Sequence, residues 1–114
     1  METNIKPQQY VTKDSGERIE FASGFTRDVN TDKPRYDLIH LECLKRLAEL
    51  YTRGSIKYGD NNWRKAESKE EMDRFKESAF RHFIQYMMNE EDEDHASAVV
   101  FNIFAYQWLT KYKK

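Results

Sequence analysis

Residues 68–89 read SKEEMDRFKESAFRHFIQYMMN, and this stretch decides the fold class. It opens with Ser68-Lys69-Glu70-Glu71, a capping box in which a serine and a glutamate three residues apart satisfy the free N–H groups of a helix N-terminus. Apolar side chains then recur every three or four residues, which is the period of a helix with one inner face. Asn89 is the predicted end of this helix. The predicted inner stripe consists of Met72, Phe75, Ala79, Phe83 and Met87.

A second helix is predicted before this stretch. Leucines and Tyr51 recur at helical spacing, and they predict a helix from about Asp37 to Thr52. Gly54 and Gly59 are the predicted helix breakers. Residues 57–63 are therefore expected to form a loop.

A third helix is predicted after this stretch. It is expected to begin within residues 92–94, because acidic side chains stabilise a helix N-terminus, and to continue to about Lys111. Its predicted inner face consists of Ala98, Val99, Ile103, Ala105, Tyr106 and Leu109.

The chain before these helices carries weaker signals. Residues 1–20 are predicted to form a flexible N-terminal arm, because residues 1–18 are polar and lack a period. Arg18-Ile19-Glu20-Phe21 alternates and predicts one short strand or an extended segment, whereas residues 23–35 are rich in turn formers and predict a long loop. Residues 21–114 are predicted to form a single helical domain. The predicted class is all-α, with three main helices and an extended N-terminal arm.

The composition limits the size of the core and the classes of partner that the protein can bind. Of 114 residues, 39% are hydrophobic and 34% charged, so a thin core completed by oligomerisation, as a homodimer or homotetramer, is expected. The net charge of −1, from 19 basic and 20 acidic residues, argues against a nucleic-acid or membrane-surface role. There is no long apolar run, no signal-peptide core, and Cys43 is the only cysteine. A cytoplasmic protein is expected.

Polar side chains interrupt the apolar faces of the second and third predicted helices. His82 falls at the edge of the inner stripe, with Ser78 one turn before it, and His95 and Asn102 fall at the centre of the inner face of the last helix. Buried polar groups need partners, or the fold loses a few kcal/mol for each. These residues therefore predict a site. The alternative is a pair of satisfied core histidines and a bridging amide.

Acidic residues beside these positions predict a metal site. Glu91-x-x-Asp94 is the spacing at which two carboxylates can hold one cation from adjacent turns, and Mg²⁺ prefers carboxylates, water and phosphate oxygens. A histidine nearby would admit Mn²⁺. The predicted ligands are Glu91, Asp94, His82 and His95. The alternative is a solvated acidic cluster that caps a helix.

Two loops contain residue types that suit the phosphates and the base of a nucleotide. Arg27, Lys33 and Arg35 place three cations in one loop, which suits a polyphosphate. The segment from Lys57 to Trp63 combines aromatic surfaces with amides able to read a base edge. The predicted base-binding residues are Lys57, Tyr58, Asn62 and Trp63. The alternatives are a solvated loop and a helix end followed by a packing tryptophan.

Five ordered motifs resemble the phage-associated dATP/dGTP diphosphohydrolase family, which is related to the MazG-like all-α nucleoside triphosphate pyrophosphohydrolases. The resemblance covers about residues 21–110. The motifs are Ser23-Gly24-Phe25-Thr26-Arg27-Asp28, Lys33-Pro34-Arg35-Tyr36-Asp37-Leu38-Ile39, Lys57-Tyr58-Gly59 with Asn62-Trp63, Ser78-Ala79 with Arg81-His82, and Asp94-His95 with Asn102.

The resemblance implies an enzyme and a reaction. A (deoxy)purine nucleoside triphosphate would be hydrolysed between its α and β phosphates to the monophosphate and pyrophosphate, with Mg²⁺ or Mn²⁺. It also implies an oligomer with shared active sites, in the host cytoplasm if the protein is phage-encoded. Asp94 and His82 are then the expected catalytic residues, with Ser78 and Asn102 in support.

The chain departs from the MazG pattern at one point. That pattern has Glu-Glu-x-x-Glu on one helix and Glu-x-x-Asp on the next. Glu91-x-x-Asp94 matches the second part, but Arg74 stands where the first part needs its third acid. Glu71 lies eleven residues before His82, about 16 Å along a helix, so both can hardly bind one ion.

Two rival functions remain. A His-Asp phosphohydrolase needs histidine followed directly by aspartate, but this chain has the order Asp94-His95. The other rival is a catalytically inactive nucleotide-binding or protein-interaction module of a phage. The incomplete acidic pattern favours this second rival.

Overall fold

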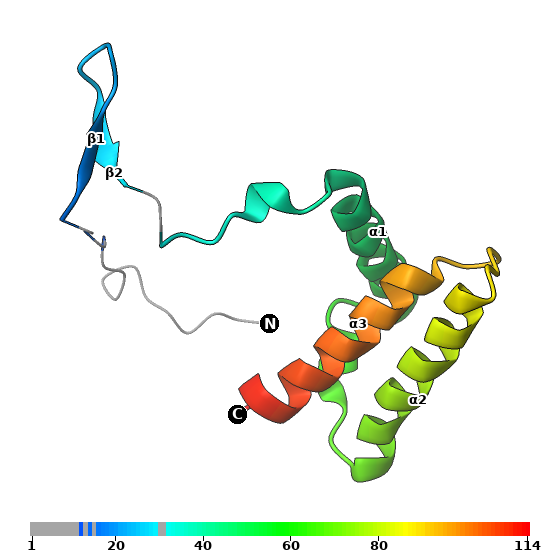
Figure 1. Cartoon of the computed structure of the whole chain (residues 1–114). Helices are drawn as coiled ribbons and strands as arrows, with labels where there is room; N and C mark the ends of the chain where they lie inside the picture. The colour runs from blue at the N-terminus through cyan, green and yellow to red at the C-terminus, as the bar shows by residue number, and fades with distance from the viewer. Residues whose placement is uncertain (1–11, 13, 15, 30–31) are drawn as a thin grey trace. The chain divides into compact units, whose positions relative to one another are not determined.

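The computed structural model describes residues 12, 14, 16–29 and 32–114. The chain divides into two compact units, Met1–Leu38 and Ile39–Lys114. Each is described by itself, and Figure 1 identifies their elements by label and colour. Most of the predicted arm, residues 1–20, lies outside the described residues, and the predicted boundary at residue 21 stays a prediction.

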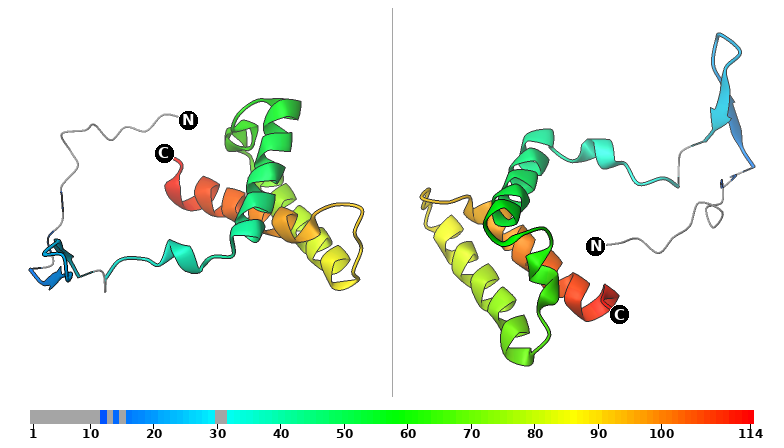
Figure 2. Two further views of the ribbon diagram at one scale, coloured as in Figure 1. Left: turned by 90° about the horizontal axis from the view of Figure 1, so that it is seen from above. Right: turned by 180° about the vertical axis from the view of Figure 1, so that it is seen from behind.

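The second unit consists of three helices, which confirms the predicted all-α class. They are α1 (Leu41–Tyr58), α2 (Lys69–Met87) and α3 (His95–Gln107). Helix α3 packs against both other helices, most extensively against α2, as the views in Figures 1 and 2 show. The middle position of α3 explains why the few buried side chains of the unit concentrate on it.

Helix α1 begins later and ends later than predicted. The His40 side chain accepts the N–H of Cys43 at the N-terminus, and residues Tyr36–Leu38 form a separate 3-10 turn. The helix continues through Gly54, because a helical glycine costs only about 1 kcal/mol relative to alanine. Its end is Gly59, whose φ of 92° suits a residue without a β-carbon and whose N–H bonds to the carbonyl of Ser55. The predicted loop over 57–63 is therefore wrong in its first two residues, which belong to α1, and in its last two, which begin the 3-10 turn Asn62–Lys65.

Helix α2 has the predicted capping box. Ser68 accepts the N–H of Glu71, and the Glu71 carboxylate accepts the N–H of Ser68. Asn89, with φ of 59°, lies just beyond the helix, which confirms the predicted end. The C-terminal part of the predicted inner stripe is wrong, because Phe83 and Met87 are 45% and 60% exposed.

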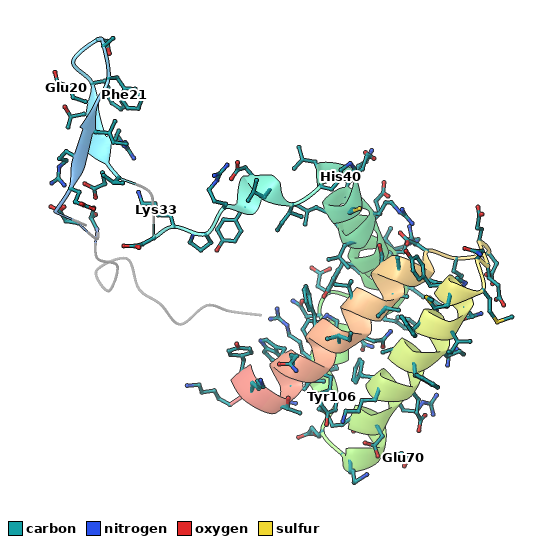
Figure 3. The ribbon with its side chains drawn as sticks, viewed as in Figure 1. Glu20, Phe21, Lys33, His40, Glu70 and Tyr106 are labelled. Carbon is teal, nitrogen blue, oxygen red and sulfur yellow. The ribbon has the colours of Figure 1, made fainter. Side chains whose placement is uncertain are left out.

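His82 takes the buried position on α2 instead, at 9% exposed. It does so because α3 begins at His95, and the two histidine rings lie against each other with centroids 5.1 Å apart. The buried face of α2 thus turns from the predicted Phe83 toward His82. Figure 3 shows Glu70 in the first turn of α2 and Tyr106 on the neighbouring α3.

Helix α3 starts where the acidic residues predicted. Asp94 is its N-cap and accepts the N–H of Ser97. A π-helical turn, Trp108–Tyr112, continues the helix and accounts for the predicted end near Lys111. Ala98, Ala105 and Leu109 are buried as predicted, whereas Ile103 is 47% exposed.

The first unit contains a small β-hairpin. β1 (Arg18–Glu20) was predicted as a strand, and it pairs antiparallel with β2 (Thr26–Asp28). The long loop predicted for residues 23–35 is therefore wrong over β2. A glycine at φ of 91°, Gly24, lies in the connection between the strands.

The helical unit leaves much of its apolar surface exposed. Among the described residues, only Ala98, Ala105 and Leu109 form a buried hydrophobic core. Large apolar side chains that are more than half exposed include Leu41, Ile56, Phe80, Met87, Met88 and Phe104. No helix among the described residues combines the length and apolarity needed to cross a membrane.

Candidate active site

Six of the residues predicted for the site line one cavity between the three helices. The cavity has a volume of about 640 Å³ and is lined by residues of α1, α2 and α3 and of the turn between α2 and α3. The predicted residues in it are Lys57, Ser78, His82, Glu91, Asp94 and Asn102. These six residues, which are separated by up to 45 positions in the sequence, thus line one cavity.

A second cavity of about 760 Å³ adjoins the first, since Ser78 and Asn102 line both. We call these two cavities together the groove. The second cavity is lined by the remaining predicted base-binding residues, Tyr58, Asn62 and Trp63. These three residues also line an apolar pocket of about 680 Å³. The predicted base-binding residues thus lie beside the predicted metal and catalytic residues.

The ring of Trp63 is fixed by aromatic packing. It lies edge-on to Trp108 and Phe101, at centroid distances of 5.4 and 6.3 Å. The guanidinium of Arg64 lies 5.0 Å from the Trp63 ring and 4.8 Å from the Trp108 ring. Trp63 therefore forms a rigid wall, whereas the Tyr58 ring is 60% exposed and has the Lys57 ammonium 5.2 Å from its centroid.

Asp94 is held firmly from two sides. Arg46 of α1 donates to both its carboxylate oxygens, at 3.0 and 2.8 Å, and Ser97 donates through its backbone N–H at 3.2 Å and its hydroxyl at 2.9 Å. Burial acts to raise the pKa of Asp94, but the hydrogen bonds from Arg46 and Ser97 outweigh it and hold the pKa below its usual value. Asp94 is therefore ionised, with its four acceptor positions in use.

His82 and His95 form a buried pair, and His82 lines the groove. Their Nδ1 atoms lie 2.8 Å apart, and His95 Nε2 lies 2.8 Å from an Asp92 carboxylate oxygen. Burial lowers the pKa of His82 below its usual value, so this ring is neutral at neutral pH. His95 lies beneath the surface at 2% exposed.

The described residues contain one group with the spacing of a metal site. Possible ligand atoms of Glu90, Asp92 and His95 lie within 4.8 Å of one another. This group overlaps the predicted set only at His95. Glu91 lines the groove and has no hydrogen-bond partner among the described residues.

The predicted phosphate-binding residues belong to the other unit. Arg27 lies in β2, and Arg35 is paired with Asp37 at 2.7 Å. Lys33 lies in the segment between the hairpin and the 3-10 turn. Their phosphate-binding role stays a prediction.

The sequence predicted Lys57 as a base-binding residue, but it did not single out Arg53 of the groove or Arg46, which pairs with Asp94. Arg53 and Lys57 are four residues apart on α1 and line the same cavity as Asp94. Arg53 went unnoticed because the helix was predicted to end at Thr52. Arg46 went unnoticed because its partner is 48 residues away in the sequence.

A comparison with protein families identifies the chain. Residues 23–114 match the family model described as dATP/dGTP diphosphohydrolase, N-terminal. This confirms the resemblance found in the sequence motifs, and nearly the same range of residues is covered. Neither the curated proteins nor the solved structures contain a match.

Proposed function

Since the chain belongs to the dATP/dGTP diphosphohydrolase family and is thereby a nucleoside triphosphate diphosphohydrolase, we propose that it hydrolyses a (deoxy)purine nucleoside triphosphate to the monophosphate and pyrophosphate. The observation that carries the proposal is the groove. It brings Lys57, His82, Glu91, Asp94 and Asn102 together from the three helices and from the turn between α2 and α3. Because the proposed substrates belong to the cytoplasmic nucleotide pool, we propose that the protein acts in the cytoplasm, which is that of the host if it is phage-encoded.

The groove has one end for a base and one for phosphates. Tyr58, Asn62 and Trp63 offer a ring face, an amide and an aromatic wall at the end beside the apolar pocket. Aromatic stacking on a base contributes about 1–3 kcal/mol. Asn62 would read the edge of the base, since an amide both donates and accepts.

Cations at the other end would hold the phosphates. Arg53 and Lys57 project from α1 into the cavity that contains Glu91 and Asp94. Arginine binds phosphate through a planar fork and lysine as a point charge. The loop cations Arg27, Lys33 and Arg35 remain proposed phosphate ligands as well, with their contribution to be tested by substitution.

A divalent metal ion completes the proposed site. Glu91 fits as a ligand, because it lines the groove without a protein partner. Asp94 fits only if the ion displaces one of its donors, since Arg46 and Ser97 use its oxygens. His95 could bind the ion only by giving up one of its two hydrogen bonds. His82 could bind it through Nε2, which forms no hydrogen bond with a described residue. Mg²⁺ or Mn²⁺, when bound, would offset phosphate charge and lower the pKa of a water.

The chain's own residues would orient the reactants. His82 faces the groove as a neutral imidazole that can take a hydrogen bond from a water. Arg53 and Lys57 would stabilise the charge that develops on the leaving pyrophosphate. Asn102 donates its amide N–H to the carbonyl of Ala98 at 2.8 Å, which fixes the side chain at the junction of the two cavities.

We also propose that the protein is a homo-oligomer, a dimer or tetramer. The support is the exposed apolar surface of the helical unit, with Phe80, Met87 and Met88 of α2 and its end each at least 60% exposed. Burying each such side chain contributes about 1.5–3 kcal/mol. A second copy that covers them would supply the core that one chain lacks.

The products of dATP and dGTP test the proposed reaction. Each nucleotide is incubated with the protein and Mg²⁺ or Mn²⁺, and the products are separated by anion exchange. The proposal expects a deoxynucleoside monophosphate and pyrophosphate. A deoxynucleoside diphosphate with orthophosphate would contradict the proposed position of cleavage.

A matched pair of variants tests the groove. Asp94→Asn is expected to abolish hydrolysis and to leave the helical circular dichroism intact, because asparagine also caps helices. Asp73→Asn makes the same change at a residue that pairs with Lys69 outside the groove, at 2.6 Å, and is expected to stay active. Full activity of Asp94→Asn would contradict the role of Asp94.

A further inference from the structure

Asn102 of α3 has one side-chain atom without a protein partner. The residue is 7% exposed, and its Nδ2 donates to the carbonyl of Ala98 at 2.8 Å. Because a carbonyl oxygen can only accept, this bond fixes the orientation of the amide and leaves Oδ1 on its other side. Oδ1 forms no hydrogen bond with a described residue. Asn102 thus carries an unused acceptor at a buried position.

This acceptor is not enclosed by protein. In the described part of the chain, the only buried side-chain nitrogens and oxygens without a partner belong to Arg64. Oδ1 of Asn102 therefore borders open space, and Asn102 lines both cavities of the groove. It also lines a smaller cavity of about 280 Å³, beside Lys76 and Gln107. Because an acceptor at such a position costs free energy while it is unpaired, it favours a ligand that donates to it.

Ser78 supplies a donor at the same place. It lies on α2, which packs against α3 (Figure 1), and its hydroxyl forms no hydrogen bond with any residue that the structure describes. A hydroxyl group can donate as well as accept, and it rotates to suit its partner. Among the described residues, only Ser78 and Asn102 line both cavities of the groove. The junction of the two cavities thus offers one free donor and one free acceptor.

The junction is the place where the sugar of a nucleotide would lie. The sugar of a nucleoside triphosphate links the base to the phosphates, and the proposed base and phosphate ends of the groove lie in the two cavities that meet at this junction. A deoxynucleoside triphosphate has one free sugar hydroxyl, at the 3′ position. That hydroxyl has one hydrogen to donate and lone pairs to accept, which matches the acceptor of Asn102 and the donor of Ser78.

We propose that Asn102 and Ser78 form the sugar subsite of the groove, in which Asn102 Oδ1 accepts a hydrogen bond from the 3′-hydroxyl of a deoxynucleotide and the Ser78 hydroxyl donates one to the same sugar oxygen. The inference deepens the proposed function and rests on it for the places of the base and the phosphates. The subsite disfavours nucleotides without a 3′-hydroxyl, because both side chains would then lose their partner.

The test compares two nucleotides that differ only in the 3′-hydroxyl. The ligands are the analogues of dGTP and of 2′,3′-dideoxy-GTP in which a methylene group bridges the α and β phosphates, so the proposed cleavage cannot occur during the measurement. Binding is measured by isothermal titration calorimetry with Mg²⁺ present. The dissociation constant of the dideoxy analogue is expected to be roughly 3- to 10-fold higher, as for a lost hydrogen bond. Equal dissociation constants for the wild type overturn the proposal.

Variants assign this difference to the two side chains. Asn102→Ala removes the acceptor and is expected to bring the ratio of the two dissociation constants to about 1; the Ala98 carbonyl keeps its ordinary helical partner, so the helical circular dichroism should not change. Ser78→Ala removes only a hydroxyl and is expected to lower the ratio as well, and it is the deciding variant if Asn102→Ala does not fold. Gln107→Ala is the control, because Gln107 lines the smaller cavity and not the groove, and it is expected to keep the wild-type ratio.

The outcomes separate the sugar subsite from the proposed reaction. A wild-type ratio in Asn102→Ala or in Ser78→Ala overturns the subsite, and so does a ratio that Gln107→Ala abolishes equally. Hydrolysis of dGTP by a wild type that binds both analogues equally would refute the subsite and leave the reaction standing. A ratio that depends on Asn102 in a protein that hydrolyses no nucleotide would refute the reaction and leave the subsite intact. Absence of binding of both analogues would refute both.

Discussion

Replacing Arg46 by alanine removes the ion pair that ties α1 to the start of α3. The guanidinium donates to both oxygens of Asp94, at 3.0 and 2.8 Å, and the side chains are 53% and 14% exposed. A hydrogen bond to a charged group contributes about 1.5–3 kcal/mol when shielded, and an exposed ion pair about 0.2–1 kcal/mol. Because one partner is half exposed and Asp94 keeps its bonds to Ser97, we expect a coupling of about 1 kcal/mol between Arg46 and Asp94.

The assay is a double-mutant cycle in urea, followed by helical circular dichroism at fixed protein concentration. The cycle compares Arg46→Ala, Asp94→Asn and the double variant. Asparagine keeps the helix cap, so the cycle isolates the ion pair. Arg53→Ala is the control, because Arg53 lines the same cavity but forms no ion pair among the described residues. A coupling within about 0.3 kcal/mol of zero for Arg46 would refute the assignment.

Three further predictions concern the helix ends and the base site. Hydrogen bonds from Ser68 and Glu67 lower the pKa of Glu71 in the folded protein. The ionised Glu71 should therefore stabilise the fold above about pH 4.3, and this stabilisation should be lost as the pH falls through the folded pKa. The unfolding free energy of the wild type should exceed that of Glu71→Gln at neutral pH, and the difference should shrink in acid. Gly59→Ala should destabilise by roughly 1–3 kcal/mol because of the φ of 92°, whereas Gly54→Ala within the helix should stabilise, and equal urea midpoints would contradict this. Tyr58→Ala should raise KM about 10-fold through lost stacking, whereas Tyr112→Ala, at a similarly exposed tyrosine outside these cavities, should not.

The helices were predictable because their signals are local. The capping box at Ser68 and the end at Asn89 need only neighbouring residues, and both are found. The period of 3.6 residues also placed His95 and Asn102 on the inner face of α3, where they are 2% and 7% exposed. Local hydrogen bonding and helical geometry were sufficient for these features.

The remaining features depend on contacts between distant residues. Strand β2 has only three residues and no alternating pattern, so it forms through its partner β1. The passage of α1 through Gly54 depends on packing that outweighs a cost of about 1 kcal/mol. Arg46 and Asp94 are 48 residues apart, and no sequence pattern links them. The shape of the groove could not be predicted for the same reason.

Pyrophosphate release is the most direct test of the account. The protein is incubated with each of the eight ribo- and deoxynucleoside triphosphates, with Mg²⁺ or Mn²⁺, and pyrophosphate is measured alongside nucleotide binding. The account predicts release from dATP and dGTP, with purines preferred over pyrimidines and no release after the metal is chelated. Binding of these nucleotides without any release of pyrophosphate would contradict the account and would indicate an inactive nucleotide-binding module.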